Sequence, residues 1–241
     1  MLRVHSIETF GTHDGPGLRL VIFLQGCGLR CLYCHNPDLW ERCGGKLMKR
    51  SDLIKTAEKQ REYFGKNGGV TVSGGEPTLQ VKNLTKLFIS LKKRGINTAL
   101  DTNGIIVSKE VKRLYRYSDL VLLDVKHIDE KMHIKLTGAS NGNVFKMAEF
   151  REKSGKDMWI RYVLVPGWND SDKYLRQFGE YFKNYKTIKK IEILPYHTLG
   201  VYKYKELGLK YKLSKVKPPT KENIENAKKI LSEYFSNVTV E

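Results

Sequence analysis

Short runs of valine, isoleucine and leucine recur along the chain and predict β-strands. Several of these runs are apolar at nearly every position, which is typical of strands that are buried on both faces. The predicted strands cover residues 18–24, 70–73, 98–101, 120–125, 158–165 and 191–194, with a short seventh over 238–240.

Between these runs, apolar residues recur at the three-to-four-residue spacing of amphipathic helices. The predicted helices cover residues 51–64, 84–94, 108–115 and 144–153, then about 170–184 and 220–235. Ser51, Ser108 and Thr220 are suited to cap helix N-termini, and Gly95 is placed to end a helix. The stretch 201–221 is rich in lysine and tyrosine, and we expect it to be a loop or an ordered surface extension.

Strand and helix predictions alternate about six times along the chain. Such alternation favours an α/β fold in which parallel strands are joined by right-handed crossover helices. The pattern by itself leaves open a closed barrel, a partial barrel and a doubly wound sheet. The chain has no internal repeat and no low-complexity linker. Its 241 residues suit one core, so we expect a single domain over residues 1–241.

The chain is strongly basic, with 43 Lys and Arg residues against 26 Asp and Glu residues and a net charge of +17. A basic surface attracts nucleic acid by counterion release, although lysines that only solvate helix faces are the simpler explanation. The longest apolar run, over residues 20–24, is too short to span a bilayer. The first residues lack the apolar stretch of a signal peptide, so we expect a cytoplasmic protein.

Three of the four cysteines, Cys27, Cys31 and Cys34, form a C-x3-C-x2-C motif after the first predicted strand. Thiolates are soft ligands that favour an iron–sulfur cluster or zinc. A [4Fe–4S] cluster normally takes four thiolates, so three would leave one iron open to hold a substrate. The alternatives are a zinc site completed by His35, or clustered buried thiols. Cys43 lies outside this spacing and is interpreted as an incidental free thiol.

The cysteine motif, with Tyr33 in its aromatic position, resembles the signature of the radical S-adenosylmethionine (SAM) superfamily. A second motif agrees, because the strand prediction over 70–73 runs into Gly74-Gly75-Glu76, which resembles that superfamily's motif for the methionine amino group. A carboxylate there can accept a hydrogen bond from an ammonium group. The resemblance implies that SAM binds the open iron of a reduced [4Fe–4S] cluster and is cleaved to methionine and a 5′-deoxyadenosyl radical.

Longer motifs in the same order resemble the family of pyruvate formate-lyase-activating enzymes. They cover residues 11–19, 25–27, 33–36, 100–104, 123–126, 159–163, 165–168, 194–197, 211–213 and 217–219. The resemblance implies a partial (β/α)6 TIM-like barrel that is open on one side. It implies abstraction of a glycine Cα hydrogen from pyruvate formate-lyase, a flavodoxin or ferredoxin as electron donor, and a monomer. The alternatives are an activase of another glycyl radical enzyme, or a basic nucleic-acid-binding protein with a structural metal.

The resemblance also implies roles for individual residues. Cys27, Cys31 and Cys34 would hold the cluster. The implied SAM contacts are Tyr33, His35, Gly74, Gly75, Glu76, Asp101, Asp124, Val125, Lys126 and His197. A monovalent cation, K⁺ or Na⁺, would be held by Asp101, Thr102, Asp124 and the carbonyl of Leu122. Carboxylate and carbonyl oxygens suit such hard cations.

Three further sets of residues are singled out with less specific expectations. Asp14, in the glycine-rich loop 11–17, is implied by the resemblance to contact the partner peptide, although Asp is also a common turn former. Arg161 faces inward by strand alternation and would pair with an anion or with a structural carboxylate. His5, His127 and His133 are assigned no function.

Overall fold

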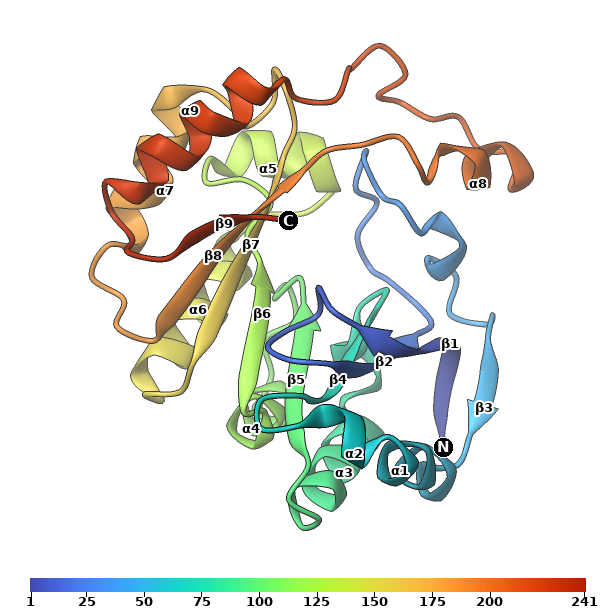
Figure 1. Cartoon of the computed structure of the whole chain (residues 1–241). Coiled ribbons are helices and arrows are strands. Elements are labelled where there is room, and N and C mark those ends of the chain that lie inside the picture. Colours follow the sequence, from blue (N-terminus) through green and yellow to red (C-terminus); the bar gives the residue numbers. More distant parts are fainter. The chain divides into compact units, whose positions relative to one another are not determined.

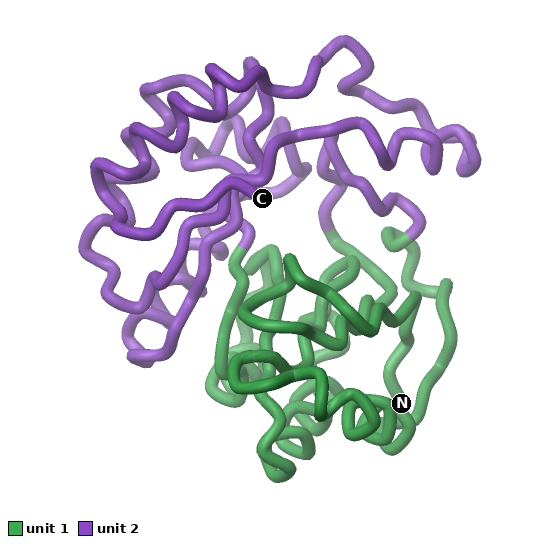
Figure 2. Tube along the Cα trace, viewed as in Figure 1, with its two compact units in different colours: residues 1–28, 39–123 green, residues 29–38, 124–241 purple.

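The computed structural model describes residues 1–241. The chain divides into two compact units, which Figure 2 shows in different colours. The first unit comprises residues 1–28 and 39–123, and the second comprises residues 29–38 and 124–241. The boundary separates Cys27 in the first unit from Cys31 and Cys34 in the second. The single domain expected over residues 1–241 stays a prediction.

The first unit is a mixed sheet with helices packed on it (Figure 1). Its elements are β1 (Leu2–Gly11), β2 (Arg19–Leu24), β3 (Lys46–Met48), α1 (Arg50–Lys59), α2 (Arg61–Phe64), β4 (Gly69–Gly74), the short 3₁₀ helix η2 (Pro77–Gln80), α3 (Val81–Lys92), β5 (Asn97–Thr102), α4 (Lys109–Tyr117) and β6 (Leu120–Asp124). The sheet has the strand order β3-β1-β2-β4-β5-β6, and β6 ends at the boundary with the second unit.

Strands β2, β4, β5 and β6 pair in parallel, as their continuous apolar runs predict. Leu24 at the end of β2 lies opposite Gly74, and Asp101 near the end of β5 lies opposite Leu122. Residues such as Leu20 and Val72 in the middle of these strands are fully buried. Because parallel strands in register end at the same edge of a sheet, the motifs that follow them are brought together there.

The two strands that the sequence analysis missed, β1 and β3, pair in antiparallel fashion at one edge of this sheet. Only three of the ten residues of β1, Leu2, Val4 and Gly11, are buried, and β3 is exposed at two of its three positions. A strand that buries so few side chains lacks the apolar run on which the other predictions depend.

Every predicted helix is present, but the one predicted over residues 51–64 is divided into α1 and α2 at Gln60, and one predicted cap is wrong. Ser108 accepts a hydrogen bond from the Val111 amide at 3.1 Å, and Thr220 forms a capping box with Asn223. Helix α1 begins at Arg50 instead of after Ser51, because Lys49 is the cap residue. The Ser51 hydroxyl lies inside the first turn, where it donates to the Asp52 carboxylate and does not cap the helix.

The second unit holds the remaining elements. These are the 3₁₀ helix η1 (Pro37–Leu39), whose last residue belongs to the first unit, α5 (Glu130–Thr137), α6 (Gly142–Lys153), β7 (Met158–Leu164), α7 (Asp172–Phe182), β8 (Ile188–Pro195), α8 (Val201–Glu206), α9 (Lys221–Ser232) and β9 (Val238–Val240). Strands β7, β8 and β9 are parallel neighbours. Helix α5 was not predicted, because its eight residues carry only a weak apolar stripe, with His133, Leu136 and Thr137 buried.

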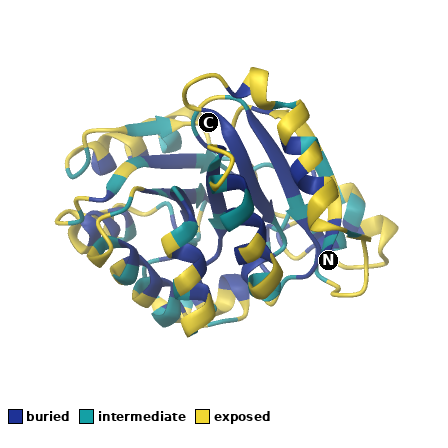
Figure 3. Cartoon of the chain, turned by 90° about the horizontal axis from the view of Figure 1, so that it is seen from below, coloured by how far each residue is buried: buried dark blue, intermediate teal, exposed yellow.

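The stretch 201–221 is an ordered surface extension, as one of the two expectations for it held. Helix α8 forms its beginning, and Tyr204, Tyr211 and Leu213 are buried at 4%, 9% and 3% exposure. Figure 3 shows the strands mostly buried and the exposed residues on the outer faces of the helices. No helix of the protein combines the length and the apolar character needed to cross a membrane.

Candidate cluster and cofactor site

The first cysteine and the Gly-Gly-Glu motif are joined by backbone hydrogen bonds in the first unit. The Gly75 amide donates to the Leu24 carbonyl at 2.9 Å, and the Glu76 amide donates to the Gly26 carbonyl at 2.7 Å. A Cβ on Gly75 would lie 2.2 Å from the Gly26 oxygen. The glycine is therefore required by the close approach of two strand ends, which positions the residue before Cys27.

Glu76 is fully buried, and its carboxylate holds the ends of β4 and β5 together. One oxygen accepts hydrogen bonds from the amide and hydroxyl of Thr78 and from the Thr102 hydroxyl, and the other accepts from the Asn103 amide at 2.9 Å. Burial raises the pKa of Glu76, and these donors oppose that rise. The sequence analysis gave this carboxylate the role of accepting from an ammonium group, and that role stays a prediction. The donors that it meets in the structure lie within the protein.

Asp101 and Asn103 flank Thr102 at the end of β5. The Ser73 hydroxyl donates to the Asp101 carboxylate at 2.6 Å. The Asn103 side-chain amide lies 3.8 Å from the Cys27 sulfur, within reach of a weak N–H···S contact. Ser73 and Asn103 were not assigned a role from the sequence, although both belong to the strand-end motifs that were noted.

In the second unit, Tyr33, Asp124, Val125 and Lys126 lie together. The Lys126 ammonium donates to Asp124 at 2.9 Å and lies 5.6 Å from the centroid of the Tyr33 ring. Burial opposes the charge on Lys126, but Asp124, Tyr33 and Cys31 raise its pKa well above the usual value. Lys126 is therefore a largely shielded cation beside an aromatic ring, with 11% of its side chain exposed, and the Val125 amide anchors this turn on the Arg161 carbonyl.

His35 and His197, far apart in the sequence, stack in the second unit with ring centroids 3.9 Å apart. The His35 Nε2 donates to the His197 carbonyl at 3.0 Å, which leaves Nδ1 as the acceptor of a neutral ring. Burial lowers the pKa of His35, in agreement with the neutral form. Both residues were implied as SAM contacts, and the structure brings them side by side.

The three cysteines of the motif form no disulfide, and backbone hydrogen bonds hold part of the loop that carries them. The Arg30 and Leu32 amides donate to the Thr137 and Leu136 carbonyls, each at 2.9 Å. No three His, Cys, Asp or Glu side chains form a group that could hold a metal ion as they stand. The donor set itself, three cysteine thiols that form no disulfide, fits the soft ligation of an iron–sulfur cluster.

The glycine-rich loop that contains Asp14 is held by a buried arginine of the first unit. Arg19 is fully buried, and its guanidinium donates to the Thr71 hydroxyl and the Asn97 side chain, each at 3.0 Å. The Thr71 hydroxyl in turn donates to the Asp14 carbonyl at 2.6 Å. Desolvation lowers the pKa of Arg19 to about 10, so the guanidinium remains charged near neutral pH.

Arg161 pairs with a structural carboxylate, which decides between the two interpretations left open by the sequence. Its Nε donates to Glu192 at 2.9 Å, and the two side chains are 10% and 1% exposed. The other Glu192 oxygen accepts from Lys190 at 2.8 Å. This pair links β7 to β8 within the second unit. Cys43 is exposed and stays an incidental thiol in our interpretation.

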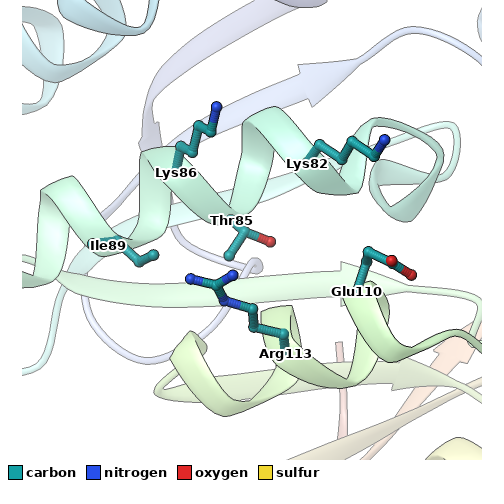
Figure 4. A pocket seen from close by; sticks show the side chains of 6 residues that line it. All are labelled: Lys82, Thr85, Lys86, Ile89, Glu110 and Arg113. Carbon is teal, nitrogen blue, oxygen red and sulfur yellow. The ribbon is translucent and has the colours of Figure 1, made fainter.

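A pocket of about 210 Å³ lies between α3 and α4, on the outer helices of the first unit (Figure 4). It is lined by Lys82, Thr85, Lys86, Ile89, Glu110 and Arg113. The Arg113 guanidinium points from α4 toward α3, whereas the ammonium groups of Lys82 and Lys86 point away from this guanidinium. None of the residues predicted for the site lines this pocket, so it is separate from the strand-end site.

Comparison with known proteins identifies the family. A profile of the Radical SAM superfamily matches residues 21–178. The chain is 46% identical over 236 residues to the pyruvate formate-lyase-activating enzyme of Streptococcus mutans, covering 95% of this chain and 90% of that one. It is 44% identical to the pyruvate formate-lyase 1-activating enzyme of Escherichia coli K12, covering 98% of this chain and 97% of that one.

Solved structures agree on the fold. A domain of pyruvate-formate lyase-activating enzyme from Bacteroides vulgatus matches with a TM-score of 0.61 and 25% identity, over 72% of this chain and 99% of that one. Streptococcus suis SuiB bound to precursor peptide SuiA matches with a TM-score of 0.72 and 21% identity, over 98% of this chain and 50% of that one. The predicted fold class, the open partial barrel of the radical SAM fold, is confirmed. The chain thus belongs to the radical SAM superfamily and, within it, to the family of pyruvate formate-lyase-activating enzymes.

Proposed function

We propose that this protein activates pyruvate formate-lyase by abstracting a hydrogen atom from the Cα of a glycine in that enzyme. When bound, the reduced [4Fe–4S] cluster supplies the electron that cleaves SAM to methionine and a 5′-deoxyadenosyl radical. Transfer of the glycine hydrogen atom to this radical would give 5′-deoxyadenosine and would leave the unpaired electron on the partner's glycine. The observation that carries the proposal is the Glu76–Gly26 backbone hydrogen bond, which joins the Gly-Gly-Glu motif to the residue before Cys27.

The residues of the chain would bind and orient the cluster and SAM. Cys27, Cys31 and Cys34 would ligate the cluster, with the Asn103 amide beside the Cys27 sulfur. Gly74, Gly75 and Glu76 would meet the methionine ammonium, while the Glu76 carboxylate also accepts hydrogen bonds from within the protein. The remaining SAM contacts would come from Tyr33, His35, Asp101, Asp124, Val125, Lys126 and His197.

A monovalent cation would neutralise part of the negative charge near the SAM carboxylate. The register of β5 and β6 supports this role, because Asp101 lies opposite Leu122, whose carbonyl is one proposed ligand. Thr102 and Asp124 would complete the site. The test is SAM cleavage in buffers whose only cation is K⁺, Na⁺ or tetramethylammonium, with the last expected to be the slowest. Equal rates in all three buffers would remove the cation from the proposal.

Two protein partners belong to the proposal. The glycyl radical loop of pyruvate formate-lyase would meet the loop of residues 11–17, which Arg19 and Thr71 hold through the Asp14 carbonyl. A flavodoxin or ferredoxin would deliver the electron, and the net charge of +17 would speed the approach of such acidic carriers. We keep the monomer as part of this proposal.

The deciding experiment is anaerobic reconstitution with iron and sulfide, followed by reduction in the presence of SAM and pyruvate formate-lyase. We expect 5′-deoxyadenosine together with a glycyl radical doublet in the electron paramagnetic resonance spectrum. Cys27→Ala, Cys31→Ala or Cys34→Ala should each abolish both products, whereas Cys43→Ala should keep them. A reconstituted protein that cleaves SAM but never yields the doublet would overturn the choice of partner.

A further inference from the structure

The segment that follows β8 contacts the cysteine loop of the second unit at four points. On the cysteine loop, the contacts fall on residues 34–38, and on the other side they fall on His197, Gly200, Lys203 and Tyr204. None of these contacts was expected from the sequence, in which His35 and His197 were singled out only as implied SAM contacts. The segment therefore does more than cover the surface, and each contact has its own geometry.

Tyr204 holds the backbone of a cysteine. Its hydroxyl donates to the Cys34 carbonyl at 3.0 Å, and its side chain is only 4% exposed. The ring packs edge-on against Tyr211 at 4.9 Å, and the Tyr211 hydroxyl lies 2.7 Å from that of Tyr196. The Tyr204 hydroxyl is thus a fixed hydrogen-bond donor beside the cysteine loop.

Lys203 holds the far end of the same loop. Its ammonium donates to the Asp38 carboxylate at 3.0 and 3.1 Å and to the Asn36 side chain at 2.8 Å. The Lys203 and Asp38 side chains are 20% and 27% exposed, so this ion pair is partly shielded from water. Because Lys203 and Tyr204 are consecutive in α8, one turn of helix grips the loop at two places.

Gly200 and His197 close the contact. A Cβ on Gly200 would lie 2.6 Å from the His35 carbonyl oxygen and 2.7 Å from its Cα, so no larger residue fits without moving the loop. The His197 carbonyl accepts from the His35 ring. On its other side, the loop is bonded to the end of α5 through the Arg30 and Leu32 amides. The loop is therefore held between α5 and residues 197–204.

We infer that residues 197–204 are a clamp that holds Cys34 and His35 in the position needed to retain the iron–sulfur cluster. Tyr204 and Lys203 are positioning residues, because they act on the backbone and flanks of the loop and not on the cluster. The cluster part of this inference rests on the proposed function. The clamp itself is a property of the protein without the cluster, and it can be measured there.

The first test is hydrogen exchange of the cluster-free protein at the backbone amides of residues 31–38. Tyr204→Phe removes only the hydroxyl, and we expect exchange there to become about fivefold faster, the effect of losing one hydrogen bond. The matched control is Tyr202→Phe in the same helix, where the side chain is 59% exposed. Unchanged exchange in Tyr204→Phe would overturn the clamp.

The second test exchanges the charges of the Lys203–Asp38 pair. Lys203→Glu should accelerate both the amide exchange and the loss of the reconstituted cluster to a chelator, followed by absorbance. Adding Asp38→Lys to this variant should restore both rates, whereas Lys205→Glu, the same charge change on the exposed side of α8, should leave them unchanged. Failure of the double variant to recover either rate would overturn the clamp, even if Tyr204→Phe destabilised the whole protein.

These outcomes separate the clamp from the proposed function. If the variants lose amide protection and cluster retention while the unmodified protein never forms a glycyl radical, the proposed function fails and the clamp stands. If the radical forms and the variants retain normal exchange and normal cluster retention, the function stands and the clamp fails.

Discussion

At the scale of single residues, buried polar groups and close backbone contacts position the strand-end site. The Glu76 carboxylate ties the ends of two strands, Arg19 ties the loop of Asp14, and Gly75 lets two backbones meet. None of these three residues reaches outward in the structure. Substituting these residues should therefore impair folding and cluster retention directly. The reaction should be affected only as a consequence of these losses.

The first prediction concerns the Glu76 carboxylate. Glu76→Gln replaces an acceptor that faces backbone and hydroxyl donors with an amide that must turn one N–H toward a donor. We expect a loss of about 1–3 kcal/mol in the free energy of unfolding, measured by urea denaturation of the cluster-free protein. Glu225→Gln, at an exposed position of α9, is the control. Equal stability of both variants would contradict the assigned hydrogen bonds.

The second prediction concerns the glycines of the two motifs. Gly75→Ala would place a methyl group 2.2 Å from the Gly26 oxygen, and we expect a loss of about 1–3 kcal/mol or more. Gly28→Ala, inside the cysteine motif, meets nothing nearer than 3.6 Å and should be tolerated. Thermal unfolding of the two cluster-free variants compares them. The opposite order of stability would refute the close approach of the strand ends.

At the scale of elements, parallel strands in register bring distant motifs to one edge, and charge pairs reinforce the pairing. Strands β2, β4, β5 and β6 carry the first-unit residues of the site, and β7 and β8 are joined by the buried Arg161–Glu192 pair. A buried pair is expensive to break, because the partner that remains is left charged and poorly solvated. Breaking an exposed ion pair costs much less, because water solvates the charge that remains.

The third prediction compares these two kinds of ion pair. Glu192→Gln leaves Arg161 and Lys190 without their carboxylate, and we expect a loss of about 3–5 kcal/mol in unfolding free energy. Glu233→Gln removes the exposed pair with Arg176, whose side chains are 47% and 43% exposed, and should cost less than about 1 kcal/mol. Equal losses in the two variants would show that burial does not govern the Arg161 pair.

At the scale of the whole molecule, the net charge and the buried histidines affect association and stability and take no direct part in the proposed reaction. The net charge of +17 raised a nucleic-acid hypothesis beside the simpler one of lysines that solvate helix faces, and steering of acidic electron carriers is its role only in our proposal. Two histidines that were assigned no function, His127 and His133, are buried at 0% and 1% exposure. They are structural groups, and they make the stability of the fold depend on pH.

The fourth prediction is this pH dependence. The Asp129 amide donates to His127 Nδ1 at 2.9 Å and Nε2 donates to the Trp168 carbonyl, so only the neutral ring fits. Burial lowers the pKa of His127 below the unfolded value of about 6.5. The unfolded chain therefore binds more protons just below this pH, and the unfolding free energy should fall as the pH falls below about 6.5.

Denaturation of the cluster-free protein between pH 5 and pH 7.5, the range about the unfolded histidine pKa, measures the slope. His127→Gln should reduce the slope, because one of the buried imidazoles is gone, while His13→Gln at an exposed position should not. An unchanged slope in His127→Gln would remove this residue from the pH dependence.

The amino-acid sequence was enough to predict the α/β class, seven of the nine strands, and the motifs that identify the family. It could do so because buried parallel strands need continuous apolar runs, and because C-x3-C-x2-C and Gly-Gly-Glu are local patterns. Strands β1 and β3 and the short helix α5 were not predicted, since each buries too few side chains to produce a recognisable apolar pattern.

Which polar groups face each other could not be predicted without the three-dimensional fold. It turned Glu76 inward, paired Arg161 with Glu192, and placed Tyr204 on the Cys34 carbonyl across 170 positions of sequence. No local pattern encodes such contacts, because a hydrogen bond depends on distance and direction between groups that the fold alone brings together. The cysteine motif indicates iron–sulfur ligation from the sequence alone, whereas the residues that hold this motif in place are identified only in the three-dimensional structure.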